Sequence, residues 1–440
     1  MKQLIKKLTT RFILDAYHAI WPFLGAIVYG NSSEKLKVIG ITGTNGKTSA
    51  THMTTHVLES AGFKVASVST LRFKIADREW TNKLKMTMPG RMKLQKFMRD
   101  AVKAGCTHLV MEVTSEGIKQ SRHKFIKFDT AVFTNLTKEH IESHGGFENY
   151  KKAKGRFFAE PHRVSVVNLD DANAEYFLNF PAEHKITYGI NSKSSGKVEK
   201  EIIAVDAEIN NNGIKFKVDD VQFALPLLGE FNVYNALAAT GASMVQRVAL
   251  EQCAKALKTF KGIPGRMEIV INEPFSVVVD YAHTPDALIK VYKTLISANP
   301  KSEYRNPKQI QNSNDKNYKL ICVLGSAGGG RDKWKRPEFG KIAAEYCDEI
   351  ILTDEDPYDE NPSQILSEIE SGISNFEFRI SKILDRRKAI HKALELAKDG
   401  DTVVITGKGA EPLMMTKEGP VEWDDRKVVV EEFNNLNKNI

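Results

Sequence analysis

The chain has 440 residues, of which 42% are hydrophobic and 27% charged, values ordinary for a globular protein of two or three domains. A net charge of +8 is modest for this length, and no RNA-binding module or arginine–aromatic patch is apparent, so the sequence predicts no nucleic-acid partner. The cysteines are too scattered for a zinc site or a disulfide framework, which favours a cytoplasmic location; they are Cys106, Cys253, Cys322 and Cys347.

Residues 1–34 predict an amphipathic helical segment. Basic residues precede an apolar run, but Asp15, His18 and Pro22 interrupt that run, which argues against a signal peptide or a membrane span. This helix is expected to pack on the protein or to lie on a membrane surface as a peripheral contact. The apolar residues that fit one helical face are Ile13, Ala16, Tyr17, Ile20, Leu24, Ile27 and Val28.

A central domain is predicted over residues 35–262, where short apolar segments alternate with helical patterns. This alternation is typical of a parallel sheet with helices on both faces. Alternating residues and an NNNG turn in 201–226 predict hairpins inserted in this domain. The predicted strands are 36–41, 64–69, 107–113 and 129–135, and the predicted helices are 47–61 and 90–104.

A second α/β unit is predicted over residues 263–440. The polar run 302–317 is expected to be a mobile surface loop. The fold class is therefore α/β, with a central P-loop ATPase domain on a parallel sheet and a C-terminal Rossmann-like domain. The predicted strands of the second unit are 275–282, 318–326, 348–354 and 401–407.

The segment ITGTNGKTS follows the first predicted strand and precedes a predicted helix. A strand, a glycine-rich turn and a helix form a phosphate-binding loop, in which backbone N–H groups meet anionic oxygens. Lys47 would reach the β- and γ-phosphates of a nucleotide, and Thr48 would place its hydroxyl on Mg²⁺. Ile41 occupies the first glycine position of the longer Walker pattern, so the alternative is a helix start that carries Gly-Lys-Thr without binding phosphate.

Two polar residues follow neighbouring predicted strands. Glu112 ends the strand 107–113, and His140 lies shortly after the strand 129–135. Ligands of open parallel sheets gather beyond the carboxyl ends of the strands, so both side chains are candidates to converge on the phosphate loop and to bind Mg²⁺. The alternatives are a helix cap for Glu112 and an ordinary surface histidine for His140.

Nine motifs occur in an order that resembles the Mur ligase family, and within it the branch that adds the third peptide residue. They are GTNGKTS, MEVTSEGIKQSR, FTNLTKEHIESHG, YKKAKGRFF, LLGEFNVYNALAA, GIPGRME, VVDYAHTPDAL, GGGRDKWKRP and GKGAE, and they span roughly residues 36 to 430. The resemblance implies a monomeric, ATP- and Mg²⁺-dependent ligase of peptidoglycan precursor synthesis. It would join an amino acid to a muramoyl-peptide-like acceptor through an acyl phosphate.

The resemblance also implies roles for individual residues. Lys47, Glu112, His140 and Lys154 would be the catalytic residues, with Thr48 and Glu112 holding one Mg²⁺, and His140 and a carbamylated Lys154 a second. Left unmodified, Lys154 would be an ordinary helix lysine. The residues expected to contact ATP are Gly43, Thr44, Asn45, Gly46, Lys47, Thr48, Ser49, Asn232, Asn235, Arg266, Asp280 and His283.

The substrate sites depart from the family pattern. The expected acceptor contacts are Thr87, Thr114, Gln120 and Arg122, but Met86, Met88 and Glu116 replace polar residues and a histidine of the family. The expected amino-acid contacts are Arg331, Glu355, Asp356, Gly407 and Glu411. Tyr358 replaces the arginine of diaminopimelate-adding members, and the acidic run TDEDPYDE favours a cationic side chain such as that of lysine, unless it is a solvated loop.

Only about 35 residues precede the phosphate-loop strand, whereas the family usually begins with a UDP-binding domain of about 100 residues. The alternatives are therefore a Mur-like ligase for a lipid-linked acceptor and a related folyl- or poly-γ-glutamate ligase. A non-catalytic ATP-dependent scaffold is a third alternative, which the presence of Lys47, Glu112, His140 and Lys154 disfavours.

Overall fold

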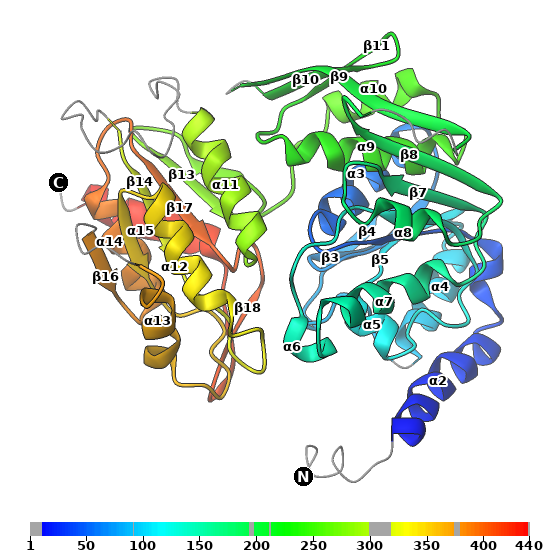
Figure 1. The fold of residues 1–440 in the computed structure, drawn as a ribbon, viewed down its shortest axis with the longest axis horizontal. Coiled ribbons are helices and arrows are strands. Elements are labelled where there is room, and N and C mark those ends of the chain that lie inside the picture. Colours follow the sequence, from blue (N-terminus) through cyan, green and yellow to red (C-terminus); the bar gives the residue numbers. More distant parts are fainter. Residues whose placement is uncertain are drawn as a thin grey trace.

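The structure is a computed structural model, and it describes residues 11–90, 92–192, 198–210, 213–298, 318–373 and 379–438. Two sheets, each covered by helices, form two lobes that lie side by side (Figure 1). The chain passes from the first lobe to the second between α10 (Leu250–Lys258) and β12 (Glu268–Ile271). The loop predicted at 302–317 lies outside the described residues.

The sheet of the first lobe has eleven strands in the described chain, in the order β11-β10-β9-β8-β7-β6-β1-β5-β2-β3-β4. The strands from β9 to β2 run parallel, and antiparallel pairs form both ends. The predicted parallel sheet and the hairpins of 201–226 are confirmed. The bounds are β1 Lys37–Thr42, β2 Val65–Val68, β3 Arg72–Ile75, β4 Arg78–Thr81, β5 His108–Glu112, β6 Phe128–Phe133, β7 Val164–Asn168, β8 His184–Ile190, β9 Lys200–Asn210, β10 Gly213–Val218 and β11 Val221–Leu225.

Helices bury both faces of this sheet, which is why its central strands are apolar without alternation. On β1, Ile39 and Ile41 belong to the core formed with α3 (Lys47–Ser60), α9 (Phe231–Met244) and α10. Val38 belongs to the opposite core. That core is covered by α4 (Lys93–Lys103), α5 (Ser115–Lys119), α7 (Phe147–Phe158) and α8 (Ala174–Leu178). The layered α/β architecture predicted for this domain is confirmed.

The second lobe holds a six-stranded sheet in the described chain, in the order β12-β13-β17-β14-β15-β16, parallel except for β12. Its strands are β12, β13 Ser276–Asp280, β14 Leu320–Leu324, β15 Glu349–Leu352, β16 Arg379–Lys382 and β17 Thr402–Thr406. One face packs on α11 (Pro285–Ala298), α12 (Lys335–Tyr346) and α13 (Pro362–Glu370), and the other on α14 (Arg386–Leu396) and α15 (Asp425–Lys438). A hairpin of β18 (Leu413–Thr416) and β19 (Gly419–Glu422) follows β17.

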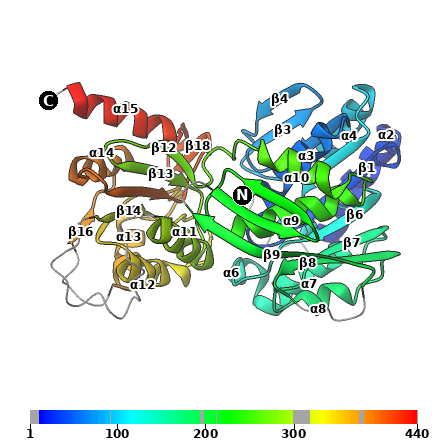
Figure 2. The same cartoon turned by 90° about the horizontal axis from the view of Figure 1, so that it is seen from above.

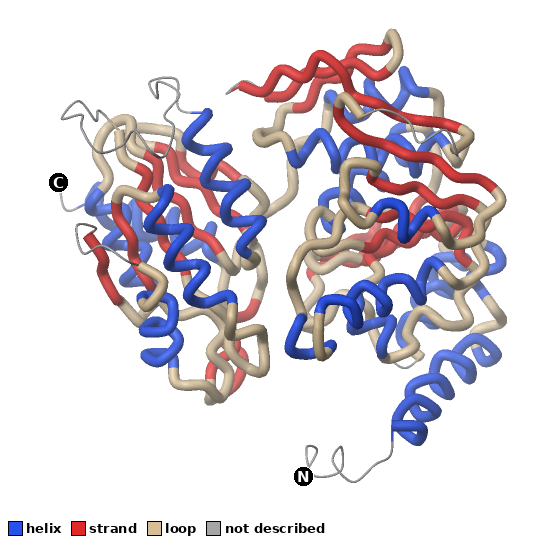
Figure 3. The backbone as a smooth tube through the Cα atoms, viewed as in Figure 1, coloured by secondary structure: helices blue, strands red, loops and turns tan. Residues whose placement is uncertain are grey.

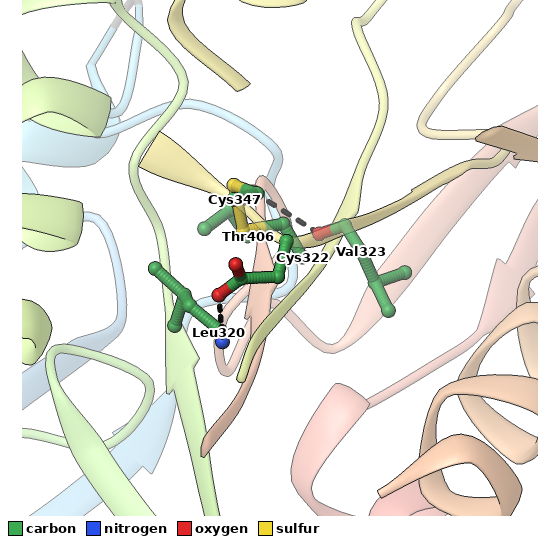
Figure 4. The surroundings of a disulfide bond; sticks show 6 residues. Leu320, Cys322, Val323, Cys347 and Thr406 are labelled. Atoms are coloured by element: carbon green, nitrogen blue, oxygen red, sulfur yellow. Dashed lines mark hydrogen bonds between the residues drawn. A yellow bond between two sulfur atoms is a disulfide. The ribbon is translucent and has the colours of Figure 1, made fainter. Parts of the chain in front are cut away.

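The second lobe contains a disulfide between Cys322 of β14 and Cys347 at the end of α12 (Figure 4). The two residues are 25 positions apart in the sequence, but their Cα atoms lie 6.0 Å apart, because α12 returns the chain to the edge of β14 before β15 begins. Cys106 and Cys253 are buried and free. The expectation that scattered cysteines form no disulfide is therefore wrong for this pair.

The N-terminal segment forms α2 (Arg11–Val28), and a short 3₁₀ turn, η1 (Ser32–Lys35), leads from it into β1. The helix lies at the outside of the first lobe, at the end of the molecule opposite to α15 (Figures 2 and 3). It packs on α4 through Pro22, Gly25 and Ala26. The predicted apolar face points to solvent, so the expectation that this face packs on the protein is wrong. Among the described helices, none is long and apolar enough to cross a bilayer.

Candidate active site

A cleft of about 920 Å³ lies between the two lobes and is lined by residues of both. Clefts between domains are the commonest places for substrate sites. All the site residues expected from the sequence line this cleft except Gly43, whose backbone lies at the start of the phosphate loop. Residues that are far apart in the chain are therefore brought to one place.

The phosphate loop connects the end of β1 to the start of α3. Gly46 adopts a φ of 81°, and a Cβ at this position would lie 2.4 Å from Oδ1 of Asn235 on α9. Glycine is thus required both by the left-handed backbone and by the close approach of α9. The segment after β6 also holds the loop, because the Asn45 N–H donates to Oδ1 of Asn135 at 2.9 Å.

Lys47 lies at the start of α3 with its ammonium folded back on the loop. Its Nζ donates to the carbonyl oxygens of Gly43 at 2.9 Å and Thr44 at 2.7 Å. Burial lowers the pKa of Lys47, although Glu112 opposes this effect. The ammonium is therefore already desolvated and close to the backbone N–H groups that would surround a phosphate.

Glu112 is fully buried at the carboxyl end of β5 and faces the phosphate loop. The Thr48 hydroxyl donates to its Oε1 at 2.9 Å, and Thr70 donates to both of its oxygens from its backbone N–H and its hydroxyl. A hydroxyl and a carboxylate are the hard oxygen ligands that suit Mg²⁺. In the described part of the chain no three His, Cys, Asp or Glu residues group as a metal cage. A single hydroxyl and a single carboxylate suit Mg²⁺, which usually keeps water and substrate phosphates as its other ligands.

His140 and Lys154 both lie next to the Tyr150 ring. The His140 ring centroid is 5.9 Å from that of Tyr150, and Lys154 Nζ lies 4.7 Å from the same centroid. Lys154 is 1% exposed and donates to the Gly43 carbonyl at 2.7 Å. Burial and the nearby Lys47 hold the pKa of Lys154 well below its usual range. As an ammonium, Lys154 offers no electron pair to a metal ion.

Glu139 is a site residue that the sequence analysis missed, although it stands beside His140 in the KEH motif. It is 4% exposed, lines the cleft, and its Oε2 has no hydrogen-bond partner among the described residues. Its Oε1 lies 3.2 Å from Nζ of Lys335, which comes from the second lobe and also donates to the His283 carbonyl. Burial raises the pKa of Glu139.

The second lobe also positions the loop that carries His140. His140 has a left-handed backbone with φ of 56°, and α6 (Ile141–His144) starts directly after it. The carboxylate of Asp332 accepts hydrogen bonds from the N–H groups of Ile141 at 3.0 Å and Glu142 at 2.9 Å. These two contacts between the lobes hold the backbone next to His140.

The residues expected near the nucleotide span both lobes. On α9, Asn235 donates to Asn232 at 3.0 Å. In the second lobe, Asp280 accepts from two backbone N–H groups at 2.7 Å, and the Arg266 guanidinium lies 3.9 Å from the ring centroid of Tyr281. Burial lowers the pKa of His283 to about 3, so this imidazole is neutral at physiological pH.

The expected acceptor contacts gather around α5. Thr114 caps this helix and accepts from the Gly117 N–H at 3.1 Å, while Arg122 donates to the Gln120 side chain and to the Met88 carbonyl. The Thr87 hydroxyl lies 2.9 Å from that of Thr70, which itself binds Glu112. The acceptor residues are therefore joined to the phosphate loop through Thr70, a link the sequence analysis missed.

The acidic run 353–360 is not a free negative surface. Lys408, which is 1% exposed, donates to both oxygens of Asp356 at 2.9 and 2.8 Å and to Glu411 at 2.8 Å. Lys85, from the first lobe, reaches the same two carboxylates. Both lysines were missed by the sequence analysis. Because Asp356 is neutralised in this way, Asp356 does not by itself favour a cationic amino-acid side chain.

Glu355 is the carboxyl group of this region that lacks a full set of partners. It is buried, and its Oε2 has no hydrogen-bond partner within the described residues. Gly407 has a φ of 105°, and a Cβ there would lie 2.2 Å from this oxygen, so glycine suits both the backbone and its close approach to Glu355. Burial raises the pKa of Glu355 to about 7. The Glu355 carboxyl group therefore has an oxygen that could pair with a cationic group of a substrate.

Comparisons with known proteins agree with this geometry. Residues 41–243 match the Mur ligase middle domain and residues 265–409 the Mur ligase, glutamate ligase domain. A UDP-N-acetylmuramyl-tripeptide synthetase of Roseiflexus sp. is 36% identical over 91% of this chain and 79% of its own length. A UDP-N-acetylmuramoyl-L-alanyl-D-glutamate–2,6-diaminopimelate ligase of Halalkalibacterium halodurans is 35% identical with the same two coverages.

A solved structure of a ligase with this second name is 32% identical, covers 91% of this chain and 79% of its own, and superposes with a TM-score of 0.59. The matches extend over both lobes and over the cleft between them. The chain therefore belongs to the Mur ligase family and is an ATP-dependent, amide-bond-forming ligase of peptidoglycan precursor synthesis.

Proposed function

We propose that this ligase joins a diamino acid to the terminal carboxylate of a UDP-N-acetylmuramoyl-L-alanyl-D-glutamate acceptor. The proposal rests on which residues line the two walls of the cleft. The first lobe contributes the phosphate loop and the acceptor residues around Arg122, and the second contributes Arg331 and Glu355. The names of the relatives give the same acceptor and a diamino acid for those proteins.

The reaction proceeds in two transfers. The acceptor carboxylate attacks the γ-phosphorus of ATP, the bond to the β-phosphate oxygen breaks, and ADP and an acyl phosphate form. The amino group then attacks the acyl carbon, loses a proton, and expels inorganic phosphate to leave the amide. Lys47 and Arg266 offset the charge of the phosphates as two anions approach each other, and both line the cleft.

Nucleotide binding uses both lobes in this proposal. Asn232 and Asn235 lie beside the adenine, residues 43–49 surround the phosphates, and Arg266, Asp280 and His283 reach the nucleotide from the second lobe. Thr48 and Glu112 would hold Mg²⁺, which would supply positive charge beside the phosphates. The Thr48–Glu112 contact of 2.9 Å supports this pairing, since it places a hydroxyl and a carboxylate oxygen side by side at the phosphate loop.

Lys154 is proposed to react with CO₂. The neutral amine attacks carbon, loses a proton, and becomes a carbamate whose anionic oxygens, together with His140, suit a second Mg²⁺. The burial of Lys154 next to the half-buried Lys47 supports this assignment, because the Lys47 ammonium repels a second positive charge and favours the neutral amine. The carbamate removes that repulsion.

The amino acid is proposed to bind against the second lobe. Arg331 holds the α-carboxylate, and Glu355, Asp356, Gly407 and Glu411 surround the rest of the molecule. The unpartnered Oε2 of Glu355 supports a substrate ammonium at this position. Thr87, Thr114, Gln120 and Arg122 hold the acceptor on the opposite wall.

The test is release of ADP and phosphate with Mg²⁺-ATP and UDP-N-acetylmuramoyl-L-alanyl-D-glutamate. Four amines are added one at a time: lysine, diaminopimelate, ornithine and glutamate. Mass spectrometry then measures the masses of the products. Turnover with a single diamino acid and the matching tripeptide mass is expected. Turnover only with glutamate, on a folate or glutamate-chain acceptor, would favour the related glutamate ligases, and turnover only on a lipid-linked acceptor would replace the soluble one.

A further inference from the structure

The helix α2 has two apolar faces, and the first lobe covers one of them. Pro22, Gly25 and Ala26 face α4, where a Cβ at Gly25 would lie 3.0 Å from Cγ of Gln95. The guanidinium of Arg99 lies over the Tyr29 ring at 4.8 Å. These contacts fix the orientation of the helix on the lobe.

The opposite face of α2 is an apolar stripe exposed to solvent. Its members recur at spacings of three and four residues, which places them within an arc of about 100° on the helix. They are between 39% and 62% exposed, which is far more than such side chains show in a core. The stripe consists of Ile13, Tyr17, Ile20, Leu24, Ile27 and Val28.

The surface around the stripe is basic. In the two segments of the first lobe that hold α2, residues 93–103 and 119–127, there is a single acidic residue, Asp100. The basic residues there are Lys93, Lys96, Arg99, Lys103, Lys119, Arg122, Lys124 and Lys127, and all the lysines are exposed. Lys96 and Arg99 pair with Asp100, and Lys124 pairs with Glu160, so basic residues remain in clear excess. In the sequence, residues 1–10 contain Lys2, Lys6 and Lys7 and no acidic residue, and α2 itself contains Arg11 and Asp15. An apolar stripe within a basic surface is complementary to anionic lipid headgroups above an acyl layer.

We propose that α2 binds this ligase to the surface of a bilayer that contains anionic phospholipid, with the apolar stripe at the boundary of headgroups and acyl chains. The helix lies along the surface, as no described helix is able to span the bilayer. This inference goes beyond the proposed function, since ligation in the cleft does not require it.

Membrane binding at α2 would bring the acceptor side of the cleft close to the bilayer. The Phe23 ring of α2 contacts that of Phe125 at 5.3 Å between centroids, and Phe125 follows Arg122 by three residues. Arg122 lines the cleft. A chain bound to the bilayer through α2 would therefore hold the acceptor side of the cleft near the membrane surface.

The test is flotation of the full chain with vesicles of phosphatidylcholine containing 30% phosphatidylglycerol, compared with pure phosphatidylcholine. We expect binding to the anionic vesicles that weakens as salt rises. The double variant Ile20→Glu, Ile27→Glu is expected to lower the partition coefficient at least tenfold. Both side chains are solvent-exposed, so ATP-dependent turnover and the thermal midpoint are expected to stay unchanged.

The matched control is Val205→Glu, Ile209→Glu on β9, where two exposed apolar side chains lie away from α2. This variant is expected to bind vesicles like the parent chain. Equal binding to both vesicle types, or no binding, would overturn the proposal. A concentration-dependent dimer in sedimentation velocity that the α2 variant abolishes, without vesicle binding, would assign the stripe to a second copy of the chain instead.

Discussion

Nζ of Lys85 lies 2.8 Å from Oε2 of Glu411 and 3.2 Å from Oδ2 of Asp356, although Lys85 belongs to the first lobe and both carboxylates to the second. Lys408 binds the same two carboxylates from within the second lobe. The four groups form a cluster with no net charge. Because Lys85 belongs to the first lobe, the charge of the proposed amino-acid site depends on a contact between the two lobes.

Lys85→Met is expected to shift amino-acid preference toward a cationic side chain, because it leaves one net negative charge beside the site. The ratio of kcat/KM for lysine to that for diaminopimelate is expected to rise about tenfold, which corresponds to about 1.4 kcal/mol. Steady-state kinetics with both amines measure this ratio. Lys83→Met, at a neighbouring exposed lysine, is the control and is expected to leave the ratio unchanged. An unchanged ratio in Lys85→Met would show that the charge of the cluster does not affect the choice of amino acid.

Lys47→Ala is expected to abolish ATP-dependent turnover without unfolding the chain. The variant removes the buried ammonium beside the phosphate loop, and transition-state charge stabilisation by one such group is worth about a hundredfold to a thousandfold in rate. ADP release and the thermal midpoint are the two measurements. Lys103→Ala, an exposed lysine at the end of α4, is the control. Normal turnover by Lys47→Ala would remove the phosphate-loop assignment.

Lys154→Ala is expected to lose at least about a hundredfold in rate and to regain part of it with added acetate or propionate. The small carboxylate would enter the space left by the side chain and replace the carbamate oxygens. Turnover is measured against carboxylate concentration, with Lys151→Ala on the same helix as a control that needs no rescue. Full activity of Lys154→Ala in the absence of carboxylate would contradict the carbamate.

Glu355→Gln is expected to change how stability depends on pH. The pKa of Glu355 is raised from 4.5 to about 7, so the folded chain keeps a proton that the unfolded chain loses between these values. The contribution of this group to stability is therefore complete below about pH 4.5 and is lost as the pH rises through 7.

At pH 5 the glutamine variant and the parent chain are expected to be similarly stable, whereas at pH 8 the variant is more stable by up to about 3 kcal/mol, at 1.36 kcal/mol per pKa unit. Denaturant unfolding at the two pH values measures the difference. The same difference at both pH values would show that Glu355 does not titrate in this range.

Local patterns in the sequence were sufficient for part of the secondary structure, including β1, β5 and α3, and for many of the residues that line the cleft. The phosphate loop between β1 and α3 follows from glycine spacing and from the apolar strand before it, since both signals lie within a dozen residues. The placement of Glu112 near Thr48 follows from parallel pairing of β1 and β5, which sets the ends of both strands at one edge.

The tertiary structure alone decided contacts that depend on side chains from distant segments. The pairing of Lys85 and Lys408 with Glu411, the disulfide between Cys322 and Cys347, and the solvent-facing stripe of α2 have no local signature. A helical period shows that a face is apolar but does not say which face meets the protein. In α2, the face that contains Gly25 is the one that meets α4. Gly25 has no side chain, so the two helices can approach each other closely there.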